Sequence, residues 1–264
     1  MFSLVSYYEI DWLKMILNAP TKPAVYRKFR KGHPEVWKHL FRRVVVGENS
    51  LTVDIGCGPG VEAEVFARIG AGIYLGIDHA IDAVVSASTA LSQKTQIHFV
   101  CADSIHLPFE NDIATIVTFM VSLHQMSDPV AVIKEAVRIV RPGGIVAVIG
   151  VPREQWIRAC EFRFFPNLIK FELERRPLQS LDEIKKLVNG TLSNIHVKWV
   201  PYLTRPVDKT IVEAVMKRHF SALRLLDNAA FKHGLNELKN HIRMTKGQQI
   251  EKIDCFILSG RKVV

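Results

Sequence analysis

The sequence predicts an α/β protein built on a parallel sheet with helices on both faces. Between residues 51 and 150, short apolar runs alternate with segments that repeat apolar residues at helical spacing. The apolar runs are almost continuous, which is typical of parallel strands buried on both faces. The 264 residues, of which 48% are hydrophobic and 23% charged, can form one such domain with insertions or two small domains.

Five strands and the helices between them follow in chain order. The expected strands are the apolar runs Leu51–Ile55, Ile73–Ile77, Ile97–Cys101, Ile113–Phe119 and Ile145–Ile149. The expected helices are the periodic segments at about 61–69, at about 81–92 and from 129 onward. The last helix should begin after Asp128, an N-cap candidate followed by a proline, and should stop at Gly143-Gly144.

The regions on either side are less regular. We expect a helix over 35–45, a short helix behind the capping box Ser180-Leu181-Asp182-Glu183, a strand at 195–200, helices within 208–244 and a last strand at 254–259. Residues 1–46 are expected to be an N-terminal helical segment. Residues 47–264 are expected to be the core domain, with a helical insertion at about 203–250.

Three glycines at alternate positions follow the first strand, in Val53-Asp54-Ile55-Gly56-Cys57-Gly58-Pro59-Gly60. A strand, a glycine turn and a helix in this order let backbone approach a ligand closely, and amides at the helix start favour anionic groups. A dinucleotide fingerprint would need its third glycine at Val61, so a nicotinamide cofactor is disfavoured. For this stretch alone, a tight turn without a ligand is the remaining alternative.

Polar residues also end the later strands of the predicted sheet. Asp78 ends the second strand, Asp103 follows the third, and Ser122 to His124 follow the fourth. Because parallel sheets bind ligands at the carboxyl ends of their strands, these residues should converge. Asp78 lies about 20 residues after the glycine turn, where a carboxylate can accept hydrogen bonds from ribose hydroxyls. A helix cap at Asp78 and a turn aspartate at Asp103 are the alternatives.

These motifs resemble those of the class I S-adenosylmethionine (SAM) methyltransferases, in particular the small-molecule, methyltransferase type 11-like group. Leu107-Pro108-Phe109 and Arg141-Pro142-Gly143-Gly144 resemble two further turns of that group, and the resemblance covers about residues 26–150. It implies a Rossmann-like seven-stranded sheet of order 3-2-1-4-5-7-6 with strand 7 antiparallel, helices on both faces and a helical lid. It also implies that residues 1–46 cover the cofactor.

The resemblance further implies which residues bind SAM. The set is Tyr26, Arg30, Asp54, Gly56, Cys57, Gly58, Gly60, Asp78, His79, Asp103, Ser104, Phe119 and Met120. In the resembling family the residue at Asp103 accepts from the adenine amino group. For Phe119 and Met120, core packing is the alternative. His124 lies beside the expected methyl group and is the candidate catalytic residue, as a general base or as a group that orients an acceptor oxygen. The alternative for His124 is a structural hydrogen-bond partner for a loop.

The leading hypothesis is metal-independent, in-line transfer of a methyl group to a small-molecule acceptor. The fourth strand is not followed by the acidic cluster of a magnesium-dependent enzyme, so no metal ligands are expected. The alternatives are an RNA or protein methyltransferase and a non-catalytic SAM-binding regulatory subunit. The net charge of +9 keeps nucleic acid open as a partner without favouring it, because the basic residues are spread along the chain. No oligomeric state is predicted.

The cysteines and the apolar segments predict a cytoplasmic location. Cys57, Cys101, Cys160 and Cys255 form no C-x-x-C pair, which favours a reducing compartment over a disulfide framework or a zinc site. The first residues do not show the pattern of a signal peptide. No stretch reaches the roughly 18 uncharged apolar residues that a membrane span requires.

Overall fold

The structure is a computed structural model of the chain, and part of the N-terminal region lies outside what it describes. The described residues are 27, 31–70, 72–175, 180–218 and 221–263. Tyr26 and Arg30, two of the predicted cofactor-binding residues, are not among them, and neither is most of the segment predicted to cover the cofactor.

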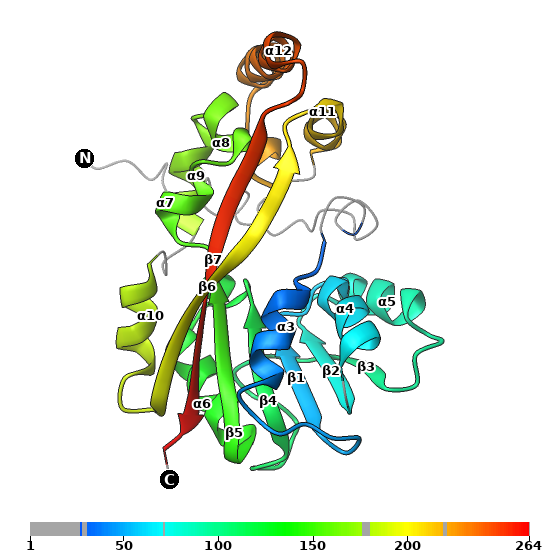
Figure 1. The fold of residues 1–264 in the computed structure, drawn as a ribbon, viewed down its shortest axis with the longest axis vertical. Coiled ribbons are helices and arrows are strands. Elements are labelled where there is room, and N and C mark those ends of the chain that lie inside the picture. The colour runs from blue at the N-terminus through cyan, green and yellow to red at the C-terminus, as the bar shows by residue number, and fades with distance from the viewer. Residues whose placement is uncertain (1–26, 28–30, 71, 176–179, 219–220, 264) are drawn as a thin grey trace, which may run out of the picture. The chain divides into compact units, whose positions relative to one another are not determined.

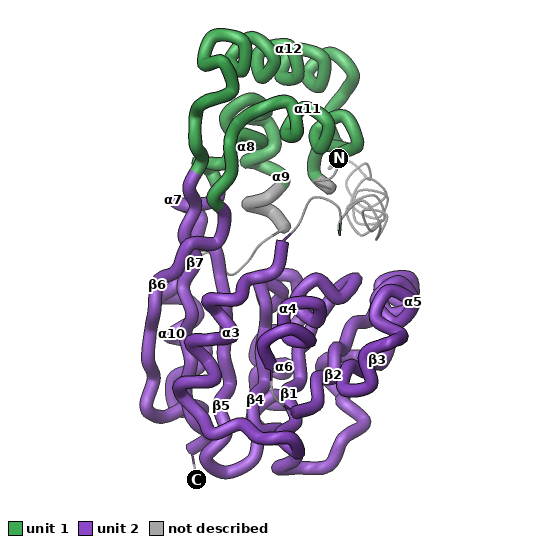
Figure 2. The backbone as a smooth tube through the Cα atoms, turned by 45° about the vertical axis from the view of Figure 1, so that its right-hand side comes forward, with its two compact units in different colours: residues 1–29, 157–175, 204–251 green, residues 30–156, 176–203, 252–264 purple. Residues whose placement is uncertain are grey.

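The chain divides into two compact units, which we describe separately (Figure 2). Unit 1 consists of residues 1–29, 157–175 and 204–251. Unit 2 consists of residues 30–156, 176–203 and 252–264. Unit 2 holds the segment from 51 to 150 on which the sequence analysis rests.

The sheet has seven strands in the order β3-β2-β1-β4-β5-β7-β6 (Figure 1). The strands are β1 Leu51–Ile55, β2 Ile73–Asp78, β3 Ile97–Cys101, β4 Ala114–Met120, β5 Val140–Gly150, β6 Leu192–Pro206 and β7 Ile250–Lys262. Strands β1 to β5 pair in parallel, and β7 pairs with β5 in the antiparallel direction. The predicted strand order and the antiparallel seventh strand are therefore confirmed.

Each face of the sheet in unit 2 packs against its own set of helices. These helices are α3 Pro34–Phe41, α4 Val61–Ile69, α5 Ile81–Ala90, α6 Pro129–Ile139 and α10 Leu181–Val188. Because successive side chains of a strand point to opposite faces, Ile116 packs with α3 and α4, whereas its neighbour Val117 packs with α6 and α10. This double burial explains the continuous apolar runs, and the predicted helices on both faces are confirmed.

Two helix starts were predicted from side-chain caps, and both caps are present. The Asp128 carboxylate accepts a hydrogen bond from the Ala131 amide at 2.9 Å at the start of α6. The Ser180 hydroxyl accepts from the Glu183 amide at 3.2 Å, and the Glu183 carboxylate accepts from the Ser180 amide at 2.8 Å. Such caps stabilise a helix by about 1 kcal/mol, which is why they can be recognised in a sequence.

Several elements have other lengths than the sequence suggested. Strand β6 has 15 residues and β7 has 13, although apolar runs were found only at 195–200 and 254–259. Much of β6 is exposed, and a strand at the edge of a sheet keeps its pairing through backbone groups without an apolar pattern. Helix α3 ends at Phe41 instead of reaching residue 45, because the chain turns with the Arg43 amide bonded to the Leu40 carbonyl.

Most of the described part of unit 1 is helical. Its helices are α8 Cys160–Phe164, α9 Leu168–Arg175, α11 Lys209–Met216, the 3₁₀ turn Ser221–Arg224 and α12 Asn228–Thr245. Phe165 stacks on Phe231 of α12 with 5.9 Å between ring centroids, and a Cβ on Gly234 would collide with Phe165. The aromatic residues after 160 therefore form part of the core of this unit. The predicted lid role of these helices remains a prediction.

A buried ion cluster joins three segments of unit 1. The Arg205 guanidinium donates to the carboxylates of Glu161 and Glu251, at 2.7 Å each, and Glu251 also accepts from the Cys160 amide at 2.5 Å. Burial raises the pKa of Glu251, and the charge of Arg205 opposes that rise. Cys160, Glu161 and Glu251 lie close enough together to hold a metal ion, but the guanidinium already supplies the positive charge between the carboxylates. We therefore interpret the cluster as structural.

Within the described residues, no helix is both long enough and apolar enough to cross a membrane.

We expect that Arg205→Met strongly destabilises the protein. The substitution leaves two buried carboxylates without a counter-ion, which costs about 3–5 kcal/mol in comparable cases. Urea unfolding at neutral pH should show the loss. Adding Glu161→Gln and Glu251→Gln should restore most of the stability, while Lys217→Met at the exposed pair with Glu213 should change it by less than about 1 kcal/mol. Equal unfolding midpoints for Arg205→Met and Lys217→Met would contradict this interpretation.

Candidate cofactor and active site

The glycine turn after β1 has the left-handed backbone that only glycines adopt without strain. Gly56, Gly58 and Gly60 have φ angles of 76°, 54° and 79°. The amides of Gly56 and Cys57 both donate to the Ile77 carbonyl of β2, at 2.7 and 3.0 Å. The turn is thereby held at the carboxyl ends of β1 and β2, the edge where parallel sheets bind ligands.

The space around the three glycines differs from one to the next. A Cβ on Gly60 would lie 3.1 Å from the Phe99 ring, and one on Gly56 would collide with Ser122 at 2.5 Å. Among the described residues, a Cβ on Gly58 would have no neighbour within 4 Å. The outer two glycines therefore permit close packing inside the protein, whereas the Gly58 backbone faces open space where a ligand can approach it.

Asp78 lies beside the glycine turn. Its carboxylate accepts hydrogen bonds from the Gly58 amide and the Ala80 amide, at 2.9 Å each, and its side chain is 11% exposed. The bond to Ala80 forms a local turn before α5, and the N-cap residue of α5 is Ala80, which has no side-chain cap, so the helix-cap alternative for Asp78 is not supported. A carboxylate offers about four acceptor positions, so two remain for ligand hydroxyls. The neighbouring His79 side chain is 88% exposed, and both cofactor roles remain predictions.

Asp103 and Ser104 follow the end of β3, next to Asp78. Register places Cys101 beside Asp78, so the residues that follow lie at the same edge of the sheet. Asp103 is exposed and accepts from the Ile105 amide at 3.0 Å, which is the turn role considered as its alternative. The Ser104 hydroxyl lies 3.5 Å from the Met126 sulfur. The exposed Asp103 carboxylate keeps acceptor capacity, and its adenine contact remains a prediction.

Asp54 lies inside the protein. Its side chain has no exposed surface, and its carboxylate accepts from the Tyr74 hydroxyl at 2.6 Å and from the Thr118 hydroxyl at 2.9 Å. Burial raises the pKa of Asp54 to about 7, and the bonds from Tyr74 and Thr118 oppose that rise. The sequence suggested that Asp54 binds the cofactor. In the structure, the Asp54 carboxylate joins β1 to its two neighbouring strands directly before the glycine turn.

Cys57 and Phe119 also contribute to packing. The Cys57 thiol is buried, and this burial raises its pKa well above the usual value, so it is not an activated nucleophile. The Phe119 side chain is fully buried in the core beneath α6, which corresponds to the core-packing alternative. Met120, the last residue of β4, is half-buried. Of these three residues, Met120 has the side chain with most surface left for a ligand.

Glu62, in the first turn of α4, is a site-supporting residue that sequence reasoning missed. Its carboxylate accepts from the Trp37 indole at 3.0 Å and from the His33 amide at 3.2 Å, and it pairs with the His33 ring at 2.5 Å. His33 also stacks on Tyr202 with 4.6 Å between ring centroids. These contacts fix the start of α3 against the helix that follows the glycine turn. The only sequence feature that pointed to Glu62 was its place two positions after Gly60. Its partners Trp37 and His33 lie 25 and 29 residues away, so the local sequence did not reveal these contacts.

His124 lies in a 3₁₀ turn, Leu123–Gln125, just after β4. The Ser122 hydroxyl donates to the Ile55 carbonyl at 2.5 Å, which ties this turn to the end of β1. The preceding residue, Val121, has a φ angle of 57°, an uncommon value for a β-branched side chain. The half-buried His124 helps to line a small cavity with Trp156 and Phe256. The turn therefore holds an imidazole and an apolar wall at the same edge of the sheet as the glycine turn.

The sheet order and the left-handed glycine turn at its carboxyl edge agree with the resemblance to class I SAM-dependent methyltransferases. Residues 53–148 match the family described as a methyltransferase domain. The particular relatives include a ubiquinone biosynthesis O-methyltransferase of Hydrogenovibrio crunogenus, 35% identical over 102 residues, or 38% of this chain and 42% of that protein.

Two further proteins are similar to this chain. A demethylmenaquinone methyltransferase of Staphylococcus haemolyticus is 27% identical over 118 residues, or 44% of this chain and 49% of that protein. Phosphoethanolamine N-methyltransferase 2 of Haemonchus contortus, solved with phosphomonomethylethanolamine and S-adenosylhomocysteine, has a TM-score of 0.62 at 15% identity, covering 96% of this chain and 60% of that chain. The chain thus spans less than half the length of these two curated relatives, and the structural likeness concerns the fold.

We expect Asp54→Asn to flatten the pH dependence of stability. An unfolded aspartate titrates near pH 3.9, well below the native pKa of about 7. Between these two pH values, the native state keeps a proton on Asp54 that the unfolded state has released. The resulting stabilisation of the native state is complete below pH ~4 and is lost as the pH rises to ~7. In this pH range the free energy of unfolding falls by up to about 1.4 kcal/mol per pH unit. An asparagine side chain at position 54 does not titrate, so this slope should disappear.

Urea unfolding between mildly acidic and neutral pH measures this effect. Asp182→Asn, at an exposed position of α10, serves as the control and should keep the slope of the original protein. Parallel profiles for Asp54→Asn and Asp182→Asn would show that Asp54 titrates normally.

Proposed function

We propose that this chain is a SAM-dependent methyltransferase that acts on a small molecule. The observation that carries the proposal is the open backbone of Gly58 beside the Asp78 carboxylate, at the carboxyl edge of the sheet. The left-handed Gly58 leaves room for the amino-acid end of a ligand, and the Asp78 carboxylate would be an acceptor for ribose hydroxyls. The residues present therefore fit a nucleoside with an attached amino acid.

The chain's own groups define how such a cofactor would be held. Gly56 to Gly60 would pack against its amino-acid end, Asp78 would accept from the sugar, and Asp103 with Ser104 would meet the adenine. Bound SAM would supply an electrophilic methyl group on a sulfonium. The half-buried Met120 and the turn at Ser122 to His124 would then border the space next to that methyl group.

For transfer, the protein must align the acceptor with the methyl group, exclude water and, for a hydroxyl acceptor, remove a proton. His124 carries an imidazole, the commonest general base in enzymes, and helps to line the small cavity with Trp156 and Phe256. We propose that His124 accepts the acceptor's proton or orients its oxygen. Metal independence is part of the proposal, since the turn after β4 offers no carboxylate before Asp128.

The names of the relatives bear on the acceptor class. Two of the similar proteins are named for ubiquinone biosynthesis and for demethylmenaquinone. The cavity beside His124 has a volume of about 20 Å³, which is too small for a ring-sized acceptor, so it does not bear on the acceptor class. We therefore propose an acceptor with a hydrophobic ring from the names of these relatives alone.

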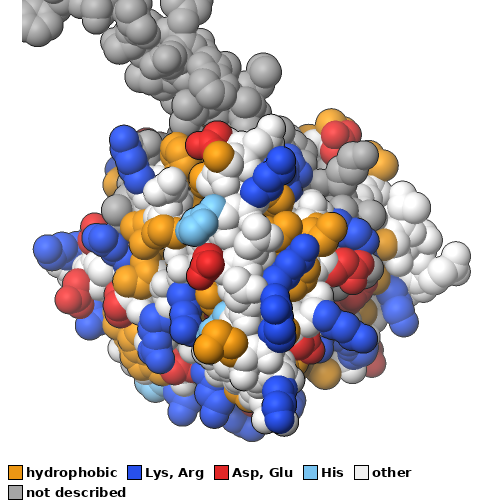
Figure 3. All heavy atoms as spheres, turned by 90° about the horizontal axis from the view of Figure 1, so that it is seen from above, with side chains coloured by type: hydrophobic (Ala, Val, Ile, Leu, Met, Phe, Trp, Pro, Cys, Tyr) orange, Lys and Arg blue, Asp and Glu red, His pale blue; other side chains and the backbone are white. Residues whose placement is uncertain are grey.

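The face of the molecule drawn in Figure 3 does not favour a nucleic-acid acceptor. On the face drawn in Figure 3, Lys and Arg side chains are scattered among acidic and apolar ones and form no continuous track.

All four cysteines are free thiols, and Cys101 is exposed. Free thiols persist in reducing compartments, which supports the proposal of a cytoplasmic location.

We expect Asp78→Ala to weaken binding of S-adenosylhomocysteine by about tenfold to 100-fold. The substitution removes hydrogen bonds to a charged acceptor, worth about 1.5–3 kcal/mol each, and frees the Gly58 amide. Isothermal titration calorimetry measures the affinity. Asp82→Ala, at an exposed position in the first turn of α5, is the matched control and should bind normally. Unchanged affinity for Asp78→Ala would refute the ribose assignment.

We expect His124→Ala to lower turnover by about 100-fold or more while leaving S-adenosylhomocysteine binding unchanged, as for the loss of a general base. Transfer of radiolabelled methyl groups to a panel of hydroquinone and phenol acceptors measures the rate. Ser127→Ala, at an exposed position just after the same turn, should retain most of the activity. Equal rates for the two variants would leave His124 with a structural role only.

A further inference from the structure

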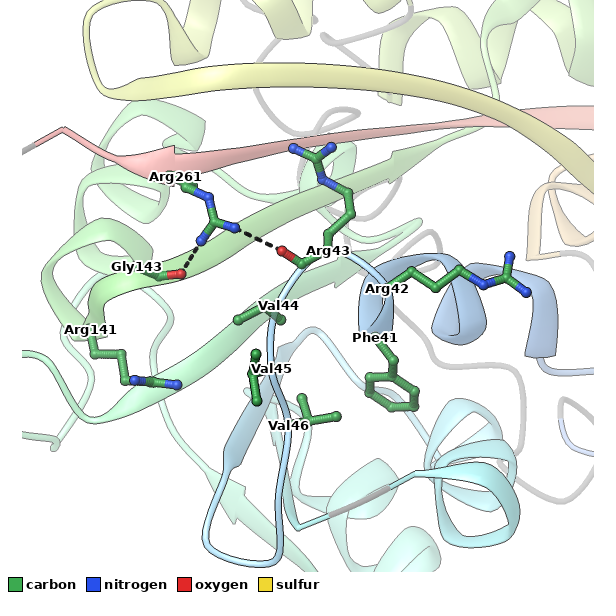
Figure 4. Close-up of a pocket in the computed structure, with 9 residues that line it drawn as sticks. All are labelled: Phe41, Arg42, Arg43, Val44, Val45, Val46, Arg141, Gly143 and Arg261. Carbon is green, nitrogen blue, oxygen red and sulfur yellow. Dashed lines mark hydrogen bonds between the residues drawn. The ribbon is translucent and has the colours of Figure 1, made fainter.

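A second pocket lies in unit 2 at the opposite edge of the sheet from the glycine turn. Arg141 and Gly143 stand at the amino end of β5, and Arg261 lies beside Ile145 at the end of the antiparallel β7. With Arg42 and Arg43, which follow α3, these residues surround a pocket of about 600 Å³ (Figure 4). We call it the arginine pocket. Its remaining walls are apolar and come from Phe41 and residues 44–46.

Three of the guanidinium groups are anchored by hydrogen bonds within the protein. Arg43 donates through a terminal nitrogen to the Asn194 carbonyl at 3.3 Å. Arg261 donates to the Arg43 carbonyl at 2.8 Å and also to the Gly143 carbonyl (Figure 4). Arg141 donates through Nε to the Thr115 hydroxyl at 3.2 Å, which leaves its two terminal nitrogens available. In Figure 4 the Arg42 side chain extends away from Arg141 and Arg261. The anchored groups of Arg43, Arg141 and Arg261 are therefore the ones relevant to a ligand.

The positive charge of the arginine pocket is not neutralised within the described part of the chain. No carboxylate there lies within ion-pair distance of Arg43, Arg141 or Arg261. The Nε atom of Arg43 is buried and has no hydrogen-bond partner among those residues. Burial, and then the nearby charge of Arg261, lower the pKa of Arg43, as expected for like charges without an anion between them. A bound anion would neutralise the positive charge of the pocket.

We propose that the arginine pocket binds the phosphate groups of a small phosphorylated molecule. Guanidinium groups present planar pairs of donors that match phosphate oxygens, and anchoring them in advance lowers the entropy lost on binding. The volume of about 600 Å³ falls within the range of small-molecule sites. The apolar wall at residues 44–46 suits an organic group attached to the phosphate. This site is separate from the proposed methyl-transfer site and does not depend on it.

Calorimetric titration with inorganic pyrophosphate at constant ionic strength tests the proposal. We expect the unmodified chain to bind pyrophosphate, and Arg141→Gln to weaken that binding by about tenfold or more, as for the loss of a bidentate contact. Lys134→Gln removes the same charge from an exposed position of α6 and should bind as the unmodified chain does. Both variants should bind S-adenosylhomocysteine equally, which checks that the cofactor side of the domain is intact.

Three outcomes would overturn the proposal. The first is that the unmodified chain does not bind pyrophosphate at millimolar concentration. The second is that Arg141→Gln and Lys134→Gln bind pyrophosphate equally well. The third is that a short single-stranded RNA binds more tightly than pyrophosphate and that Arg141→Gln weakens RNA binding more than pyrophosphate binding. The last result would assign the pocket to a nucleic-acid backbone. If Arg141→Gln does not fold, Arg43→Gln replaces it with the same expected loss and the same control.

Discussion

The buried carboxylate of Asp54 is the interaction on which the rest of the candidate site depends. It joins the middle strand of the sheet to Tyr74 on one side and to Thr118 on the other, one residue before the chain leaves the sheet. A charged or half-protonated group at zero exposure is tolerated because two hydroxyls donate to it. The strand ends that carry the glycine turn, Asp78 and the His124 turn are thereby kept in register.

Around that anchor, the site consists of short turns that are each tied to a neighbouring strand. The glycine turn bonds to the Ile77 carbonyl, Asp78 bonds to Gly58, and Ser122 bonds to the Ile55 carbonyl. Loops held by a rigid scaffold in this way can present backbone amides and side chains to a ligand with little loss of entropy. The two edges of the sheet then differ in chemistry, since one offers glycines and carboxylates and the other offers guanidinium groups.

Much of the fold follows from local signals, whereas the roles of individual site residues depend on distant partners. The strand order, the glycine turn and the caps at Asp128 and Ser180 rest on apolar runs and on neighbours within a few residues. By contrast, the burial of Asp54 depends on a tyrosine 20 residues away and a threonine 64 residues away. The full length of β6 was also missed, because an exposed edge strand has no apolar pattern.

The left-handed backbone of Val121 has a consequence for how the domain tolerates heat. A β-branched residue in this conformation holds on the order of 1–2 kcal/mol of conformational energy, which unfolding releases. The hydrogen bonds of its amide to the Phe119 and Ile149 carbonyls and the adjoining Ser122 bond retain the turn despite that cost. Replacing Val121 with glycine or asparagine should therefore raise the thermal stability of the domain. Such a variant is useful only if the His124 imidazole, three residues later, keeps its position.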